Sequence, residues 1–169
     1  MSYFVRMIRI GNWSNPDGDI ITPDEYYSIS SDAITIDLKT ENNTLSLWEI
    51  DDLLELKEIA ISLLTSRSAP QDLFVVAIPR ISVDSDFDLE NSFDGETAYI
   101  KFKNKHYNLL NLTYSKLGEF SKLVLNSLSH TEQVYDFLYK CNKSYIQQLV
   151  NNGDINKDEL KKNLRREFN

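Results

Sequence analysis

The sequence predicts a single α+β domain, residues 1–169, built around antiparallel sheet structure. Its length suits one domain with a sizeable core, and 41% of its residues are hydrophobic, including eight phenylalanines and nine tyrosines. Short segments of alternating apolar residues precede longer segments with apolar residues at helical spacing. We therefore expect two strand–loop–hairpin–helix units, over about residues 1–67 and 70–129, and two further helices in a C-terminal helical extension over residues 130–169.

The first unit begins with a strand and a long loop. Residues 3–10 are rich in residues that favour strands and end at Gly11, so we expect a strand there. Residues 11–32 contain two prolines, two glycines and many other turn formers, which indicates a loop with little regular structure. Within this loop the run NPDG at residues 15–18 predicts a tight turn.

A hairpin and a helix complete the first unit. Apolar residues alternate in residues 33–39 and again in residues 44–50, and the residues between them, 41–43, tolerate the positive φ of a tight turn. This pattern predicts an antiparallel hairpin. Apolar residues then recur at helical spacing, which predicts a helix over about residues 52–66 with Asp51 as its N-cap.

The second unit follows the same plan. Residues 72–81 predict a strand, an acidic loop follows, and residues 97–103 and 106–112 predict a second hairpin. A helix capped by Thr113 or Ser115 comes next. Its apolar positions repeat those of the first helix at a constant offset of 64 residues. Either an internal repeat or a coincidence between two amphipathic patterns explains this offset.

Two helices are expected at the C-terminal end. Ser129 and Glu132 form a capping-box pattern for a helix that should end near Gly153, and Asn156 and Glu159 form a second one. Ile155 is placed to staple Leu160 at the start of the last helix, and Leu164 and Phe168 continue the apolar stripe. This helix is otherwise strongly charged, so the sequence leaves open whether it docks on the core or is held only loosely.

Charge divides the chain into two unequal parts. The formal charge is −8, made up of −13 in residues 1–96 and +5 in residues 97–169. An acidic surface disfavours nucleic acid as a partner and suits a basic protein, although acidic loops also serve solubility alone. In the basic last helix, acids interleave with the bases, so surface ion pairs are a better explanation than a nucleic-acid site.

Several features argue for the cytoplasm. No apolar run approaches the ~20 residues that span a bilayer, and Arg6 and Arg9 interrupt the apolar N-terminus, which lacks a cleavage site. Cys141 is the only cysteine, so no internal disulfide can form. It falls on the apolar stripe of its predicted helix, and we expect an inert thiol in the core.

Few residues suggest catalysis, and no catalytic residue, metal site or cofactor is predicted. The two histidines, His106 and His130, are too few for a multi-histidine zinc site, and His106 is expected to be half-exposed on a strand. The glycines form neither of the common phosphate-binding loops. The acidic run that starts at Asp84 fails as an EF-hand, because Leu89 and Gly95 occupy the positions that require Gly and Glu.

Two acidic segments are the candidate partner-binding residues. One is the acidic run, which could also be a solvated loop or an edge strand protected by charge. The other is a loop in which acids and aromatics interleave, as they would in an interface or a sugar site. The candidate residues are Asp84, Asp86, Asp88, Glu90, Asp94, Glu96, Trp13, Asp17, Asp19 and Tyr26.

These properties favour a binding protein over an enzyme. We expect a non-enzymatic protein that binds another protein, such as a bacterial immunity protein or antitoxin that neutralises a basic toxin through complementary charge. The partner would then be a basic protein, with neither nucleic acid nor membrane involved. The alternative is a small enzyme or ligand-binding protein with an acid- and tyrosine-lined cleft between the two units.

Overall fold

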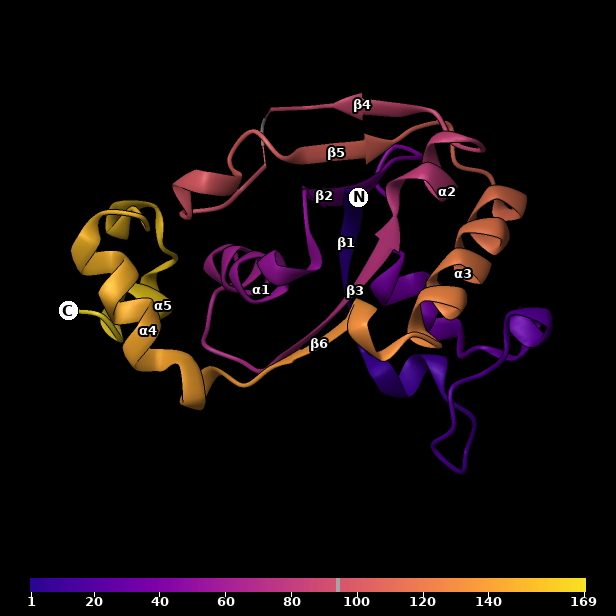
Figure 1. Cartoon of the computed structure of the whole chain (residues 1–169), viewed down its shortest axis with the longest axis horizontal. Helices are drawn as coiled ribbons and strands as arrows, with labels where there is room; N and C mark the ends of the chain where they lie inside the picture. The colour runs from indigo at the N-terminus through magenta and orange to yellow at the C-terminus, as the bar shows by residue number, and fades with distance from the viewer. Residues whose placement is uncertain (94) are drawn as a thin grey trace.

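The computed structural model describes residues 1–93 and 95–169 and, within them, contains one antiparallel sheet of six strands (Figure 1). The strands are β1 (Tyr3–Ile8), β2 (Leu45–Ile50), β3 (Leu73–Pro79), β4 (Leu89–Asn91), β5 (His106–Leu109) and β6 (Val134–Phe137). Their order across the sheet is β4-β5-β2-β1-β3-β6, and every neighbouring pair is antiparallel. The predicted α+β fold with an antiparallel sheet is therefore confirmed.

Helices cover both faces of this sheet. They are α1 (Leu56–Thr65), α2 (Arg80–Asp84), α3 (Tyr114–Leu128), α4 (Tyr139–Asn152) and α5 (Lys162–Arg166). Short 3-10 turns occupy Ile10–Trp13, Pro23–Ser28, Leu53–Glu55, Ile100–Phe102, Thr131–Gln133 and Lys157–Glu159, and a π-helical turn occupies Ala33–Asp37. Among the described residues, no helix has both the length and the apolar character needed to cross a bilayer.

The core has two parts, one on each face of the sheet. Successive residues of a strand point to opposite faces, so Phe4 and Val5 of β1 are both fully buried but belong to different clusters. Val5 lies with side chains of α1, α4 and α5, and Phe4 lies with side chains of α3 and the N-terminal loop. Figure 1 shows α1 and α3 on opposite sides of the sheet. The central strands are thus buried on both faces.

Two predicted helix ends are confirmed by their caps, at Thr113 and Gly153, and the predicted cap Asp51 is wrong by one residue. Asp52 accepts a hydrogen bond from the Leu54 N–H (2.8 Å) at the turn that leads into α1. Thr113 accepts a hydrogen bond from the Lys116 N–H (3.3 Å) and starts α3. Gly153, with φ of 81°, ends α4 in the left-handed conformation that glycine adopts readily.

The predicted strand over residues 33–39 is wrong. These residues form the π-helical turn Ala33–Asp37, and β2 pairs instead with β1 and β5. The reason is the buried carboxylate of Asp37, which accepts hydrogen bonds from the Arg9 N–H and the Trp13 indole at 3.0 Å each. The predicted turn at residues 41–43 does form, since Asn42 and Asn43 have positive φ. It connects the π-helical turn to β2, whereas the prediction had it connect two strands.

The predicted strand over residues 97–103 is also wrong. The Thr97 hydroxyl is buried in a hydrogen-bond network with Ser62 and Thr65 of α1, at 2.8 and 2.9 Å. The Ala98 carbonyl then accepts a hydrogen bond from the N–H of Asn156 (2.8 Å). This segment is therefore held by α1 and the C-terminal region, and β5 pairs with β2 and β4.

The predicted helix start at Ser129 lies too early in the chain. The Ser129 hydroxyl donates to the Leu125 carbonyl (3.1 Å) and so belongs to the end of α3. The next residues form β6, which extends the sheet beside β3, and α4 begins only at Tyr139. Residues Val134–Phe137 include side chains that favour strands, and they pair with the side of β3 that β1 does not occupy.

Two expectations about burial are wrong as well, and a question that the sequence leaves open is answered. The C-terminal segment is docked tightly, because Leu160, Leu164 and Phe168 are all buried in the core with α1, although its helix begins at Lys162 and not at the predicted cap Asn156. Cys141 is exposed, since α4 turns another side towards the core. His106 is buried in β5, where its ring packs edge-on against Trp48 at 5.0 Å between centroids. The division of the chain into two repeated units stays a prediction.

Candidate functional site

Four of the predicted partner-binding acids lie together at one edge of the sheet. Asp84 ends α2, and Asp86, Asp88 and Glu90 follow in the connection to β4 and in β4 itself; all four are exposed. We call residues 84–90 the acidic edge. β4 is the outermost strand of the sheet, at the top of Figure 1, so the interpretation of this run as an edge strand is confirmed for Leu89–Asn91.

The acids of the acidic edge differ in their partners. Asp84 forms an ion pair with Arg80 (3.1 Å), which Arg80 shares with the buried carboxylate of Glu49. Asp88 accepts a hydrogen bond from the Asn111 side chain at 3.1 Å. Within residues 1–93 and 95–169, Asp86, Asp88 and Glu90 have no ion pair. The ammonium of Lys116 lies at the Asp86 carbonyl and 5.2 Å from the Phe87 ring centroid, so it offsets part of this charge and leaves the edge with an excess of negative charge.

The remaining predicted acids lie elsewhere. Glu96 forms an ion pair with Lys161 (3.2 Å) near the C-terminal segment. Asp17 and Asp19 are exposed in the turn at residues 15–18 and just after it, in the indigo loop that lies at the opposite end of Figure 1 from β4. Asp94 falls outside the described residues. The predicted acids thus do not form one continuous face.

The two predicted aromatic contacts also differ from expectation. Trp13 is fully buried, with its indole N–H bound to Asp37, so it cannot contact a partner; its placement at an interface is wrong. Tyr26 is half-buried against α3, where the ammonium of Lys122 lies 4.5 Å from its ring centroid. The aromatic side chains of this loop mostly pack on the protein itself.

A groove of about 390 Å³ lies between residues 26–35 and α3. It contains three tyrosines, Tyr26, Tyr27 and Tyr114, but no carboxylate lines it. The alternative function predicts a cleft lined by both acids and tyrosines. This groove has the tyrosines but lacks the acids.

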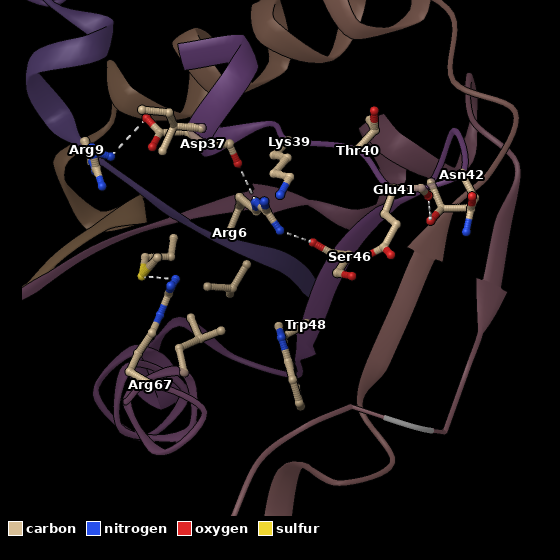
Figure 2. A pocket seen from close by; sticks show the side chains of 15 residues that line it. Arg6, Arg9, Asp37, Lys39, Thr40, Glu41, Asn42, Ser46, Trp48 and Arg67 are labelled. Carbon is tan, nitrogen blue, oxygen red and sulfur yellow. Dashed lines mark hydrogen bonds between the residues drawn. The ribbon is translucent and has the colours of Figure 1, made fainter. Parts of the chain in front are cut away.

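A second pocket lies where strands β1 and β2 separate. The two strands pair from Tyr3↔Ile50 to Val5↔Trp48, and beyond this point β1 continues beside β3 while β2 continues beside β5. The opening holds a pocket of about 510 Å³, lined by both strands, residues 36–44 and the end of α1 (Figure 2). We call it the basic pocket.

Basic side chains dominate this pocket. Arg6, Arg9, Lys39 and Arg67 line it, and they are four of the six Lys and Arg residues in the acidic part of the chain, residues 1–96. In the part of the chain that the structure describes, none of the four forms a side-chain ion pair. The carboxylates in the lining are Asp37 and Glu41.

Arg6 bridges the gap between the separating strands. Its Nε donates to the Asp37 carbonyl (2.7 Å) and its Nη1 to the Ser46 carbonyl (2.8 Å), as the dashed lines in Figure 2 show. Burial lowers the pKa of Arg6 to about 10, although the nearby Asp37 acts to raise it and Arg67 lowers it further. The guanidinium remains charged at neutral pH.

Arg67 is less well satisfied. Its Nη2 lies 3.0 Å from the sulfur of Met7, and its buried Nε has no hydrogen-bond partner among the described residues. Burial lowers the pKa of the Arg67 guanidinium, and the positive charge of Arg9 lowers it further. The guanidinium group of Arg6 thus lies near that of Arg67, and the guanidinium group of Arg67 lies near that of Arg9.

Asp37 shapes the pocket more than it neutralises it. Its Oδ2 accepts hydrogen bonds from the Arg9 N–H, the Asn12 amide and the Trp13 indole, at 3.0 to 3.1 Å. This oxygen is occupied by donors that belong to the framework, which leaves it little capacity for the guanidinium groups.

The lining of the pocket is mainly cationic and polar. It offers cations and the hydroxyl groups of Thr40, Thr44 and Ser46, and it contains no histidine or cysteine. Among the described residues, no cluster of His, Cys, Asp or Glu is placed to hold a metal ion.

Sequence reasoning missed this pocket. Arg6 and Arg9 were noted only because they interrupt an apolar N-terminus, and Lys39 and Arg67 lie far from them in the sequence. The available signal is the scarcity of Lys and Arg in residues 1–96. The few basic residues that an acidic segment contains are candidates for a specific role.

Comparison with models of known protein families, with curated protein sequences and with solved structures finds no match to this chain. Function is therefore inferred from the residues themselves.

Proposed function

We propose that this chain is a non-enzymatic protein that binds a basic protein at the acidic edge. The observation that supports this most is the group of exposed carboxylates at Asp86, Asp88 and Glu90, which have no ion pair within the described residues. A basic partner supplies the missing countercharge, and attraction between opposite potentials speeds association and sets specificity.

The strand itself supports the proposal. β4 pairs with β5 on one side, from Leu89↔Leu109 to Asn91↔Tyr107, and its other side has no strand partner among the described residues. A free strand edge can accept an extended segment of another protein through main-chain hydrogen bonds. The acids around it would repel an acidic strand and attract a basic one.

Apolar side chains flank the same edge. Phe93 follows β4 and is 68% exposed, and Ile81 in α2 is 71% exposed. Exposed aromatic and aliphatic side chains next to charged ones are typical anchors of a protein interface. An immunity protein or antitoxin that covers the basic cleft of a toxin fits this combination of charge, open edge and anchors.

The test is capture of the partner from cells of the source organism with three forms of the protein. The wild type should retain a basic protein whose affinity falls steeply with added salt. The triple variant Asp86→Asn, Asp88→Asn, Glu90→Gln should lose it. A matched control with Asp17→Asn, Asp19→Asn and Asp24→Asn changes the charge equally at other exposed sites and should retain it.

Two results would contradict the proposal. Equal loss of binding in both variants would mean that total charge matters and the acidic edge does not. A captured partner that is acidic, or whose binding is insensitive to salt, would exclude the charge mechanism.

A further inference from the structure

We propose that the basic pocket binds a small organic phosphate monoester, with the phosphate on the arginines and the organic part against the apolar wall. This site is separate from the acidic edge and requires no residue of it.

Charge is the first reason. Four cationic side chains line the pocket against two carboxylates, Asp37 and Glu41, and the Oδ2 of Asp37 already accepts three hydrogen bonds. The pocket is left with a net excess of about two positive charges, taking each group at its usual charge. A phosphate monoester carries roughly −1.5 to −2 at neutral pH and would balance this excess.

Unused donors are the second reason. The buried Nε of Arg67 has no partner within the described residues, and in the same residues Arg6 uses only Nε and Nη1 in hydrogen bonds. The unpaired Nε shows that the fold leaves the Arg67 guanidinium incompletely satisfied, and the remaining N–H groups of Arg6 and Arg67 are the donors that a ligand can use. The forked guanidinium matches the oxygens of phosphate in geometry as well as in charge.

The size and lining of the pocket indicate an organic ligand. Its volume of about 510 Å³ falls within the usual range for small-molecule sites and exceeds what inorganic phosphate fills. Apolar side chains also contribute to the wall: Val5, Met7, Ile36, Trp48 and Leu63. Among them Met7 and Ile36 are the less buried ones and offer a surface for the carbon skeleton that carries the phosphate.

The surroundings favour a small ligand over a nucleic acid. Residues 1–96, which form the pocket, carry a net charge of −13 even with these bases included. A polyanion would have to run across that acidic surface, whereas a small monoester places its whole charge among the arginines.

Isothermal titration of the full chain with several probes tests the proposal. Phenyl phosphate, glucose 6-phosphate and AMP represent monoesters, and inorganic phosphate, citrate and a single-stranded oligonucleotide represent the other anions. At least one monoester should bind several-fold tighter than inorganic phosphate and citrate. Tightest binding by inorganic phosphate, citrate or the oligonucleotide would overturn the assignment, as would no binding by any probe.

Variants locate the site. Arg67→Met and Arg9→Gln should each weaken monoester binding about tenfold, because each removes a charged donor. Glu41→Gln should strengthen it, since it removes a negative charge from the lining. Lys140→Gln is the control for the two arginine variants, because it also removes one positive charge, but on exposed α4 and outside the pocket. It should leave the affinity for the monoester unchanged.

Stability separates a binding role from a structural one. Arg67→Met removes an unsatisfied buried donor and keeps an unbranched side chain, so its melting temperature should equal or exceed that of the wild type. A lower melting temperature with unchanged affinity would assign Arg67 to the framework and overturn the proposal. Equal weakening by Lys140→Gln would overturn it too.

Discussion

The acidic edge and the basic pocket both gather charges of one sign, but they do so in different surroundings. The carboxylates of Asp86, Asp88 and Glu90 are exposed, so water and salt screen their repulsion at little cost. The guanidinium groups of Arg6 and Arg67 are partly buried, and the pKa of each is lowered by burial. Like charges at a surface are easily tolerated, whereas like charges held in a pocket oppose folding and point more strongly to a function.

The largest effect should come from the residue that holds the pocket together. Asp37→Ala leaves the buried Trp13 indole and the Arg9 N–H without their acceptor and removes the negative charge that acts to raise the pKa of Arg6. We expect a loss of about 3 kcal/mol in the free energy of unfolding, measured by urea denaturation.

Glu90→Ala at the acidic edge is the matched control, since Glu90 is exposed. It should change the free energy of unfolding by less than about 0.5 kcal/mol. Similar effects from Asp37→Ala and Glu90→Ala would break the contrast between the two regions.

The next effect concerns the pocket wall. A Cβ added at Gly95 would lie 2.5 Å from the Trp48 ring and 2.6 Å from the Cβ of His106, so one of these buried side chains must move. Gly95→Ala should lower the free energy of unfolding by about 2 kcal/mol. Gly11→Ala, where no atom lies within 4 Å of the added Cβ, is the control and should have little effect when both variants are measured by urea denaturation.

A pH titration gives a third, smaller effect. Because the pKa of Arg6 is lowered to about 10, monoester affinity should fall as pH rises through 10, where the phosphate charge no longer changes. Folding should respond in the opposite sense, because the unfolded chain keeps the Arg6 proton to higher pH and the charged form disfavours the fold.

The titration is best made with Lys39→Gln, which removes the lysine of the pocket as a second source of pH dependence. Affinity that stays constant to pH 11 in this variant would show that Arg6 does not bind the ligand.

Local features of the chain could be predicted from the sequence, and contacts between distant segments could not. The cap at Thr113 and the end of α4 at Gly153 depend on residues within one turn, and the sequence predicts both. Asn156 also caps as predicted, but only the 3-10 turn Lys157–Glu159, and α5 begins later, at Lys162. Residues 33–39 have the alternation of a strand, but bonds from Arg9 and Trp13 to Asp37 decide their structure.

The two sites follow the same rule. The acidic edge is one run of sequence, so its position in a loop or edge strand could be inferred. The four bases of the basic pocket come from three segments, with Arg6 and Arg9 in the first, Lys39 in the second and Arg67 in the third, and these segments meet where β1 and β2 separate after Val5. No spacing along the chain contains that information.

The smallest expected effect defines the boundary of the acidic edge. Glu96 was predicted as part of the binding surface, but its carboxylate already has a partner in Lys161. Glu96→Gln should therefore lower the free energy of unfolding by less than about 0.5 kcal/mol, and this difference should vanish in 1 M salt, as for an exposed ion pair. The same variant should bind the basic partner as tightly as the wild type does. If partner binding instead weakens as much as it does with Glu90→Gln, the surface extends past β4, and the ion pair with Lys161 must open when the partner binds.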